Sequence, residues 1–368
     1  MKKIKIICSV GTRPEAIKMA PLVLCFRKER WCNVLLLATA QHREMLDQML
    51  SFFNVRIDFD LNVMRQNQTF SDLTKRLLPR LDKIIRKESP DLILAQGDTT
   101  TTFLTGLCSF YNRIPFGHIE AGLRTYDKFY PYPEEMNRVL TTQLADFHFA
   151  PTEEARKNLL SGGVSRKKIW VTGNTVTDAL RLIAKTDTKL PFKPHPSRRM
   201  VLVTAHRREN FGPPFLEICR AIREIVRVFP DIEIIYPVHP NPNIHDVAYK
   251  ELGGIDRIRL LHPLDYDHFV VTMKSSTLIL TDSGGIQEEA TVIGKPVLLL
   301  RDETERPEAV AAGVVKVVGP HTDAIVKEAS FLLSGKKTYR KVAKPVSPYG
   351  DGKAAERICS ILRKRFAL

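Results

Sequence analysis

The sequence lacks several features that would decide its class at once. No apolar run approaches the ~20 residues that a membrane-spanning helix needs. No CxxC, HxH or HExxH spacing occurs, so we expect no metal site. Neither a Walker A loop nor GxGxxG is present, which removes the usual support for an ATPase or an NAD-binding enzyme. The six cysteines are scattered, several in apolar segments, which predicts reduced core thiols and a cytoplasmic location.

The charge of the chain is strongly positive, at +15. Such an excess indicates either an anionic partner or simply a solvated basic surface. The basic residues form only short clusters, such as Arg198-Arg199 and Arg363-Lys364-Arg365, without interleaved aromatic residues. We therefore expect no nucleic-acid and no membrane partner, and leave a phosphorylated small molecule as the candidate.

The start of the chain is basic and then apolar, as in a signal peptide. Lys5 interrupts the apolar stretch, which ends at Gly11-Thr12-Arg13. These residues favour a first β-strand over a signal peptide.

The length and the alternation of patterns predict two α/β domains. At ~150 residues per domain, 368 residues exceed one core. Short β-rich runs alternate with helical patterns, which is typical of βαβ units and parallel sheets. The expected strands are Lys3–Val10, Val34–Ala38, Leu92–Ala95, Phe116–Ile119, Phe147–Ala150, Ile169–Val171, Met200–Thr204, Glu233–Pro237, Ile258–Leu261, Thr277–Thr281 and Val297–Leu300.

The segment 184–198, rich in Lys, Pro and Thr, indicates the crossing between the domains. We predict an N-terminal Rossmann-like domain at 1–180 and a C-terminal one at 181–351, facing a cleft. The last helix, in 352–368, is expected to pack back on the first domain. Both halves open with a strand followed by a polar loop with Arg and Glu, where ligands bind in doubly wound sheets.

Three strand-to-helix junctions are candidates for phosphate binding. They are Gly11–Glu15 with Lys18 one turn later, Thr204–Asn210, and Asp282–Glu289. Small residues at a helix N-terminus let unpaired N–H groups approach an anion. An ordinary turn with an N-cap explains Ser283-Gly284-Gly285 equally well. Because Arg13 and His206 stand at the equivalent junctions, we favour a diphosphate between the domains.

Acidic residues follow two of the expected strands. Asp98 comes after Leu92–Ala95, and Glu120 directly follows Phe116–Ile119. Two carboxylates at the ends of neighbouring strands can act as opposed acid and base. Alternatively, Asp98 caps a helix and Glu120 pairs with Arg124. A further pair, Glu134 and Arg138, is spaced to share one helical face.

Three histidines are of interest. His206, at a strand end before Arg207, is a candidate for phosphate contact or proton transfer. His239 ends another strand and could face the cleft. His118 lies within a strand and is expected to be a core histidine.

Together these segments resemble a known family. In chain order they read GTRPEAIKMAP (11–21), QHREMLDQ (41–48), GDTTTT (97–102), 117–125, PYPEEMNR (131–138), GNT (173–175), HRREN (206–210), DSGGIQEEA (282–290), ERPEAV (305–310) and PYGDG (348–352). The order and spacing are similar to those of the non-hydrolysing UDP-N-acetylglucosamine 2-epimerases over nearly the whole chain.

The resemblance implies a GT-B-like pair of Rossmann domains, a cytoplasmic homodimer in polysaccharide biosynthesis, and no cofactor. It implies reversible epimerisation of UDP-N-acetylglucosamine to UDP-N-acetylmannosamine. In that reaction UDP leaves by anti elimination, and it re-adds to a 2-acetamidoglucal intermediate. The alternative is the hydrolysing relative, which releases UDP and N-acetylmannosamine.

The resemblance also assigns residues to roles. The implied catalytic residues are Asp98, Glu120, Glu134, Arg138 and His206. The implied substrate-binding residues are Arg13, Lys18, Phe269, Ser283, Gly284, Gly285, Glu289 and Arg306. A second UDP-N-acetylglucosamine, as activator, would meet Gln41, His42, Arg207 and His239. Glu44 and Asn67 depart from the activator pattern of some members, and Leu264 replaces a Gln near the uracil pocket.

Overall fold

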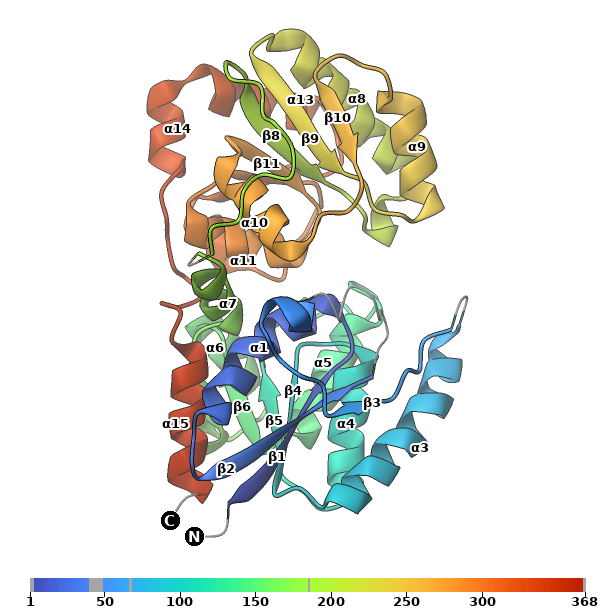
Figure 1. Cartoon of the computed structure of the whole chain (residues 1–368). Helices are drawn as coiled ribbons and strands as arrows, with labels where there is room; N and C mark the ends of the chain where they lie inside the picture. Colours follow the sequence, from blue (N-terminus) through green and yellow to red (C-terminus); the bar gives the residue numbers. More distant parts are fainter. Residues whose placement is uncertain (1–2, 40–48, 66–67, 185, 367–368) are drawn as a thin grey trace. The chain divides into compact units, whose positions relative to one another are not determined.

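A computed structural model describes residues 3–39, 49–65, 68–184 and 186–366. The chain divides into two compact units. Unit 1 comprises Met1–Leu182 and Tyr349–Leu368, and unit 2 comprises Ile183–Pro348. Each unit contains one parallel β-sheet with helices between its strands (Figure 1), so the predicted α/β class with two doubly wound domains is confirmed.

The sheet of unit 1 has seven parallel strands in the order β3-β2-β1-β4-β5-β6-β7. The strands are β1 (Ile4–Val10), β2 (Cys32–Ala38), β3 (Phe59–Asp60), β4 (Leu92–Gln96), β5 (Phe116–Ile119), β6 (Phe147–Ala150) and β7 (Ile169–Val171). The helices are α1 (Arg13–Arg27), α3 (Phe70–Glu88), α4 (Thr100–Tyr111), α5 (Glu134–Leu144), α6 (Glu153–Ser161), η1 (Arg166–Lys168), α7 (Thr175–Ile183) and α15 (Ala354–Phe366).

The sheet of unit 2 has six parallel strands in the order β10-β9-β8-β11-β12-β13. The strands are β8 (Arg199–Thr204), β9 (Ile232–Pro237), β10 (Ile258–Leu261), β11 (Leu278–Thr281), β12 (Val297–Leu299) and β13 (Val315–Val317). The helices are η2 (Arg208–Asn210), α8 (Pro213–Val228), α9 (Pro242–Leu252), α10 (Tyr266–Ser275), α11 (Gly284–Ile293), α12 (Pro307–Ala311), α13 (Thr322–Ser334) and α14 (Lys336–Val342).

Both sheets reverse their strand order at one point, between β1 and β4 in unit 1 and between β8 and β11 in unit 2. When the strands of each sheet are numbered from its first strand, both sheets have the 3-2-1-4-5-6 order of dinucleotide-binding sheets, and unit 1 has one further strand, β7, at its edge. At such a point the loops leave the carboxyl ends of neighbouring strands in opposite directions, which opens a crevice for ligands. Each unit therefore has one topologically favoured ligand site.

All eleven expected strands overlap observed ones, but β3 and β13 were missed. The reason is their length and composition. Only Phe59 and Asp60 form β3, pairing with the end of β2, and β13 is three residues at the other sheet's edge. The edge strand β7 is as short as β13 but is apolar throughout (Ile-Trp-Val), whereas Asp60 ends β3 and Lys316 interrupts β13, which leaves no apolar run in either.

The helices bury one face each. In α3 the buried residues Leu73, Leu77, Leu81 and Ile85 recur every four positions, so a single stripe packs on the unit 1 core. Burying one such side chain contributes about 2 kcal/mol. Across the described ranges, no helix has the length and apolar character to cross a bilayer.

The C-terminal segment belongs to unit 1. Tyr349 is fully buried and its carbonyl accepts from Asn174 N at 2.7 Å. The Asp178 carboxylate then caps α15 by accepting from Ala354 N at 3.1 Å and Ala355 N at 3.0 Å. The helix α15, in red, packs beside α1, in blue (Figure 1). The chain returns to unit 1 at Tyr349, three residues before the predicted start of the returning segment at 352. It first passes from unit 1 to unit 2 between residues 182 and 183, where the prediction had 180 and 181.

Candidate active site

The predicted site residues that the structure describes lie on the loops that follow the strands or on the helices to which those loops lead. In unit 1 these loops follow β1, β4 and β5, and in unit 2 they follow β8, β9, β10, β11 and β12.

Glu120 is the residue directly after β5 and has a left-handed backbone, with φ of +66°. For a residue with a side chain this conformation costs about 1 kcal/mol. Its Oε2 accepts from Lys18 Nζ and, at 2.7 Å, from Asn174 Nδ2. Lys18 and Glu120 are both buried, so this is an ion pair largely removed from water. The alternative pairing with Arg124 is not observed: Arg124 donates to Leu123 O and Thr142 Oγ1.

Asp98 follows β4 and is held by Arg138. The guanidinium donates to Asp98 Oδ2 from Nε at 2.9 Å and from Nη2 at 2.7 Å. Arg138 is nearly buried and also pairs with Glu135 at 2.8 Å, which fixes its orientation. The alternative that Asp98 caps a helix is wrong, because the neighbouring Thr99 caps α4.

Glu134 is the first residue of α5 and is half-buried, one turn before Arg138. Because α5 carries both residues, it brings Glu134 to the part of unit 1 that contains Asp98. The structure thus gathers Asp98, Glu134 and Arg138 in one group, and Glu120 with Lys18 in another on the adjacent strand end.

The first two candidate phosphate junctions have their backbone N–H groups occupied by carboxylates of the protein itself. At the first, Gly11 N and Thr12 N donate to Glu15 Oε2 at 2.9 and 2.7 Å. At the second, His206 N and Arg207 N donate to Asp282 Oδ2 at 2.8 and 2.9 Å. Neither junction offers these N–H groups to a ligand, although the half-buried side chains of Arg13 and His206 remain candidates.

The third junction differs. Ser283 is the N-cap of α11, but its side chain makes no capping bond. A methyl group added at Gly285 would meet no heavy atom within 4 Å. At Gly284 it would meet Arg306 Nη1 at 2.6 Å, so the guanidinium packs against the start of the helix. The start of α11 without a side-chain cap, the open space at Gly285 and the adjacent Arg306 make this junction the best anion candidate of the three, although Glu305 Oε1 also lies beside Gly284.

Arg306 is fixed by a buried chain of charges. It donates from Nε to Glu288 at 2.7 Å and from Nη1 to Glu305. Arg301, which is fully buried, links Glu305 at 3.1 Å to Glu209 at 2.9 Å. Burial makes each of these ion pairs sensitive to loss of a partner. The network therefore holds the Arg306 side chain at the N-terminus of α11.

Glu289 lies on α11 and Phe269 lies on α10. Tyr266, one turn before Phe269, donates its hydroxyl to Glu289 Oε1 at 2.8 Å. This contact joins the two helices that carry the residues predicted to meet uridine. Tyr266 itself was not predicted.

His206 and His239 are brought together. Their rings stack with centroids 5.5 Å apart and planes within 16°, and His206 Nδ1 lies 3.5 Å from Asp282 Oδ1. Arg207 is half-buried beside them. Of the predicted activator set, Gln41 and His42 lie outside the described residues, as do Glu44 and Asn67.

The structure adds residues that sequence reasoning missed. Asn174 binds Glu120, Asp282 closes the 206–207 loop, and Glu15 closes the 11–12 loop. Asn174 and Glu15 fall within motifs singled out above, and their position after a strand was the available signal. Asp282 also falls within a quoted motif and directly follows an expected strand, but its partners, 75 and 76 residues away, were not predictable from local sequence.

The core histidine prediction for His118 is confirmed, and it has a pH consequence. His118 is buried in β5, with Nε2 2.7 Å from Gly97 O, and faces His148 of β6 in register. Burial lowers the pKa of His118 to about 4, and burial followed by the His118 charge lowers that of His148 to about 3. Both rings are therefore neutral in the folded protein at pH 7.

We expect unit 1 to lose stability as the pH falls from about 6.5 towards 4. The unfolded histidines bind protons in this range and the folded ones do not, so unfolding takes up protons. The lowered pKa of His118 alone should reduce the free energy of unfolding by about 3 kcal/mol over this pH interval. Urea unfolding of wild type and His148→Gln at pH 7 and pH 5 measures this. An equal loss in both proteins would contradict a His148 contribution.

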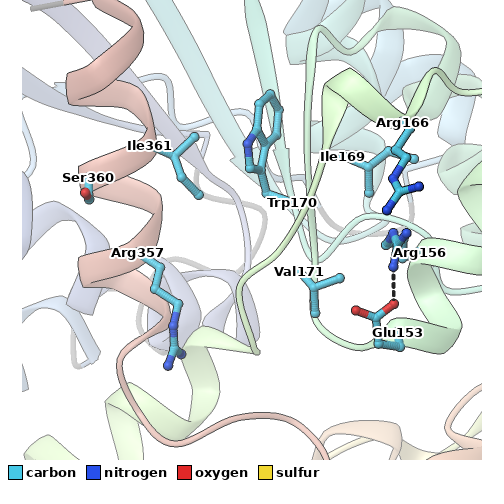
Figure 2. A pocket seen from close by; sticks show the side chains of 9 residues that line it. All are labelled: Glu153, Arg156, Arg166, Ile169, Trp170, Val171, Arg357, Ser360 and Ile361. Atoms are coloured by element: carbon cyan, nitrogen blue, oxygen red, sulfur yellow. Dashed lines mark hydrogen bonds and ion pairs between the residues drawn. The ribbon is translucent and has the colours of Figure 1, made fainter.

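The hollow drawn in Figure 2 lies elsewhere in unit 1 and has a volume of about 490 Å³. It is lined by Glu153, Arg156, Arg166, Ile169, Trp170, Val171, Arg357, Ser360 and Ile361, none of them a predicted site residue. Arg156 pairs with Glu153 and Arg357 with Asp351, so much of its positive charge is neutralised. In the described part of the chain, no group of three or more His, Cys, Asp or Glu is arranged to hold a metal ion.

Comparisons with known proteins agree with this arrangement. The model of the family "UDP-N-acetylglucosamine 2-epimerase" matches residues 25–363. The UDP-N-acetylglucosamine 2-epimerase of Escherichia coli K12 is 48% identical, over 98% of each chain.

Two solved structures are similar over nearly all of their length. The Neisseria meningitidis UDP-GlcNAc 2-epimerase bound to UDP-GlcNAc has a TM-score of 0.93 and 44% identity, covering 98% of this chain and 100% of that one. The S. aureus MnaA–UDP structure has a TM-score of 0.94 and 45% identity, covering 99% and 97%. The chain therefore belongs to the UDP-N-acetylglucosamine 2-epimerase family, whose members are isomerases.

Proposed function

We propose that the protein interconverts UDP-N-acetylglucosamine and UDP-N-acetylmannosamine at C2 without net hydrolysis. The relatives with this printed activity, one solved with UDP-GlcNAc and one with UDP, support the substrate. The observation that carries the proposal is the pair of carboxylates at the ends of β4 and β5, each held by a cation.

The reaction needs these groups for a chemical reason. One carboxylate takes the C2 proton while the C1–O bond breaks, which gives UDP and 2-acetamidoglucal. A β-phosphate oxygen of UDP then adds to C1 as C2 receives a proton on its other face. Proton removal and delivery on opposite faces require more than one acid–base group. Because no electrons are transferred to an acceptor, no redox cofactor enters the balance.

Glu120, Asp98 and Glu134 are the proposed acid–base residues. Lys18 and Arg138 orient the first two through charge-assisted hydrogen bonds. Two donors of Arg138 bind Oδ2 of Asp98, so the orientation of the Asp98 carboxylate is fixed. His206, oriented by Asp282 and stacked on His239, is proposed to contact phosphate.

The departing diphosphate is proposed to bind unit 2. The N–H groups at the start of α11 and the guanidinium of Arg306 stabilise the charge that develops on UDP as the C1–O bond breaks. Glu289, held by Tyr266, would accept from the ribose hydroxyls, and Phe269 would pack on uracil. Arg13, at the start of α1 in unit 1, stays a predicted substrate-binding residue.

Other features of the family are proposed here as well. They are a homodimer, a cytoplasmic location, a role in polysaccharide biosynthesis, and activation by a second UDP-N-acetylglucosamine at Arg207 and His239. The stacked rings of His206 and His239 support a link between that second site and the phosphate.

The test is incubation with UDP-N-acetylglucosamine in heavy water. We expect UDP-N-acetylmannosamine, deuterium at C2 of both sugar nucleotides, and only traces of free UDP. Stoichiometric UDP with free N-acetylmannosamine would select the hydrolysing reaction instead. Absence of deuterium at C2 would contradict proton transfer at that carbon.

A further inference from the structure

We propose that Glu15 is a positioning residue that ties the loop of Arg13 to the loop of Asp98. The inference rests on the proposed function for its kinetic consequences, but its structural part stands independently. Glu15 lies one turn into α1 and is only 2% exposed. It is thus shielded from any substrate, and it acts through its hydrogen bonds.

One oxygen of Glu15 organises its own loop. Oε2 accepts from Gly11 N at 2.9 Å, Thr12 N at 2.7 Å and Thr12 Oγ1 at 2.8 Å. Backbone N–H groups only donate, so Oε2 must be an acceptor. These bonds fix the turn between β1 and α1, on which Arg13 is the first helical residue.

The other oxygen reaches a different loop. Oε1 accepts from Thr99 Oγ1 at 2.6 Å and Thr102 Oγ1 at 3.1 Å, residues 84 and 87 positions further along the chain. Thr99 directly follows Asp98 and caps α4. A single buried carboxylate therefore joins the ends of β1 and β4, the two strands at which the sheet order reverses.

The side chains around Gly11, directly after β1, are closely packed. A Cβ at Gly11 would lie 2.4 Å from Thr101 Oγ1 and 2.7 Å from Thr39 Oγ1. These two hydroxyls also bond to each other at 2.9 Å. A shift of either loop would break contacts in both, so loss of the Glu15 bridge should move Asp98 relative to its partners.

A simple helix cap is the competing explanation, since Thr12 and Glu15 form a capping box on α1. The two roles use different oxygens, so they can be separated. Glu15→Gln can keep the hydrogen bonds to both loops: its oxygen accepts from Gly11 N and Thr12 N, and its NH₂ donates to the Thr99 and Thr102 hydroxyls. Glu15→Ala loses the hydrogen bonds to both loops. Thr99→Val loses the shorter of the two bonds to Oε1, and also the cap of α4, since Thr99 Oγ1 accepts from Thr102 N at 3.2 Å. Thr99→Ser retains both, so the two Thr99 variants are compared by kcat and by the hydrogen exchange of 97–103 together.

The experiment compares these variants by kcat, KM, melting temperature and hydrogen exchange of peptides covering 97–103. Thr105→Val is the matched control, because it removes a buried hydroxyl bond of α4 to Ser9, at 3.1 Å, that joins no loops. We expect Glu15→Ala to lower kcat about 100-fold with KM within about threefold. Glu15→Gln and Thr99→Ser should stay within about fivefold of wild type.

Thr99→Val should also lower kcat. The kcat of the double variant Glu15→Ala/Thr99→Val should lie within about threefold of that of Glu15→Ala, because both substitutions break the same connection between the two loops. Hydrogen exchange in 97–103 should quicken in Glu15→Ala and not in Glu15→Gln or Thr105→Val. If Glu15→Ala does not fold, the two Thr99 variants carry the same comparison.

Three results would overturn the proposal. Glu15→Gln as inactive as Glu15→Ala would make Glu15 an acid–base group. A lower melting temperature with unchanged kcat and unchanged exchange in 97–103 would make it a cap alone. Unchanged kcat in Thr99→Val would show that the hydrogen bond between Glu15 and Thr99 has no role in catalysis. Should wild type itself neither epimerise nor exchange deuterium, the proposed function fails, and the exchange in 97–103 still decides the bridge.

Discussion

Glu120→Gln is expected to lower kcat about 1000-fold while leaving the Kd for UDP within about tenfold. The substitution keeps an oxygen for Lys18 Nζ and Asn174 Nδ2 but removes the carboxylate that we propose exchanges a proton with C2. The diphosphate contacts that we propose lie in unit 2 and do not involve this side chain. Steady-state kinetics and titration calorimetry with UDP measure the two effects.

Glu233→Gln is the matched control for burial. Glu233 is 2% exposed and pairs with Arg259 at 2.6 Å near the start of β9, at the opposite end of the strand from the ligand loops. We expect it to cost stability but to leave kcat unchanged. If Glu120→Gln instead weakened UDP binding by several orders of magnitude, Glu120 would have to be regarded as a structural residue.

Gly285→Asp is expected to weaken UDP binding about 100-fold without lowering the melting temperature. Gly285 lies in the first turn of α11 with open space around it, so the new side chain has room in the unliganded protein. A carboxylate at a helix N-terminus stabilises the helix by about 0.3–1 kcal/mol. The same carboxylate would repel a diphosphate bound there.

Gly285→Asn separates charge from size, because Asn has nearly the shape of Asp and no charge. It should weaken UDP binding at least tenfold less than Asp does, with the remaining loss due to occupied space. Equal weakening by Asn and Asp would mean that no anion lies at the start of α11. A melting curve for each variant shows that the fold is retained.

The parts of the fold that follow from local pattern were predictable from sequence. Apolar runs such as Leu92–Ala95 and Phe116–Ile119 located strands, because strands buried on both faces are continuously apolar. The residue after each such strand, Asp98 or Glu120, was then placed at a carboxyl end, where ligands bind. The short edge strands β3 and β13 carried no comparable signal.

The pairing of charges was not predictable, because it depends on contacts distant in sequence. Lys18 meets Glu120 across 102 positions, and Arg138 reaches back 40 positions to Asp98. Local spacing had suggested Arg124 as an alternative partner of Glu120. Among the phosphate junctions, the first is closed by a local capping box, for which Thr12-x-x-Glu15 is the sequence signal. The second is closed by Asp282 from 75 and 76 positions away, which local sequence does not reveal.

The most direct test of the proposed site is a crystal structure of the protein with UDP. We expect the β-phosphate at the start of α11, within hydrogen-bond distance of Gly284 N or Gly285 N and of the Arg306 guanidinium, with the ribose at Glu289. UDP bound instead at the N–H groups of Gly11 and Thr12, or in the hollow of Figure 2 beside Trp170 and Arg357, would contradict it.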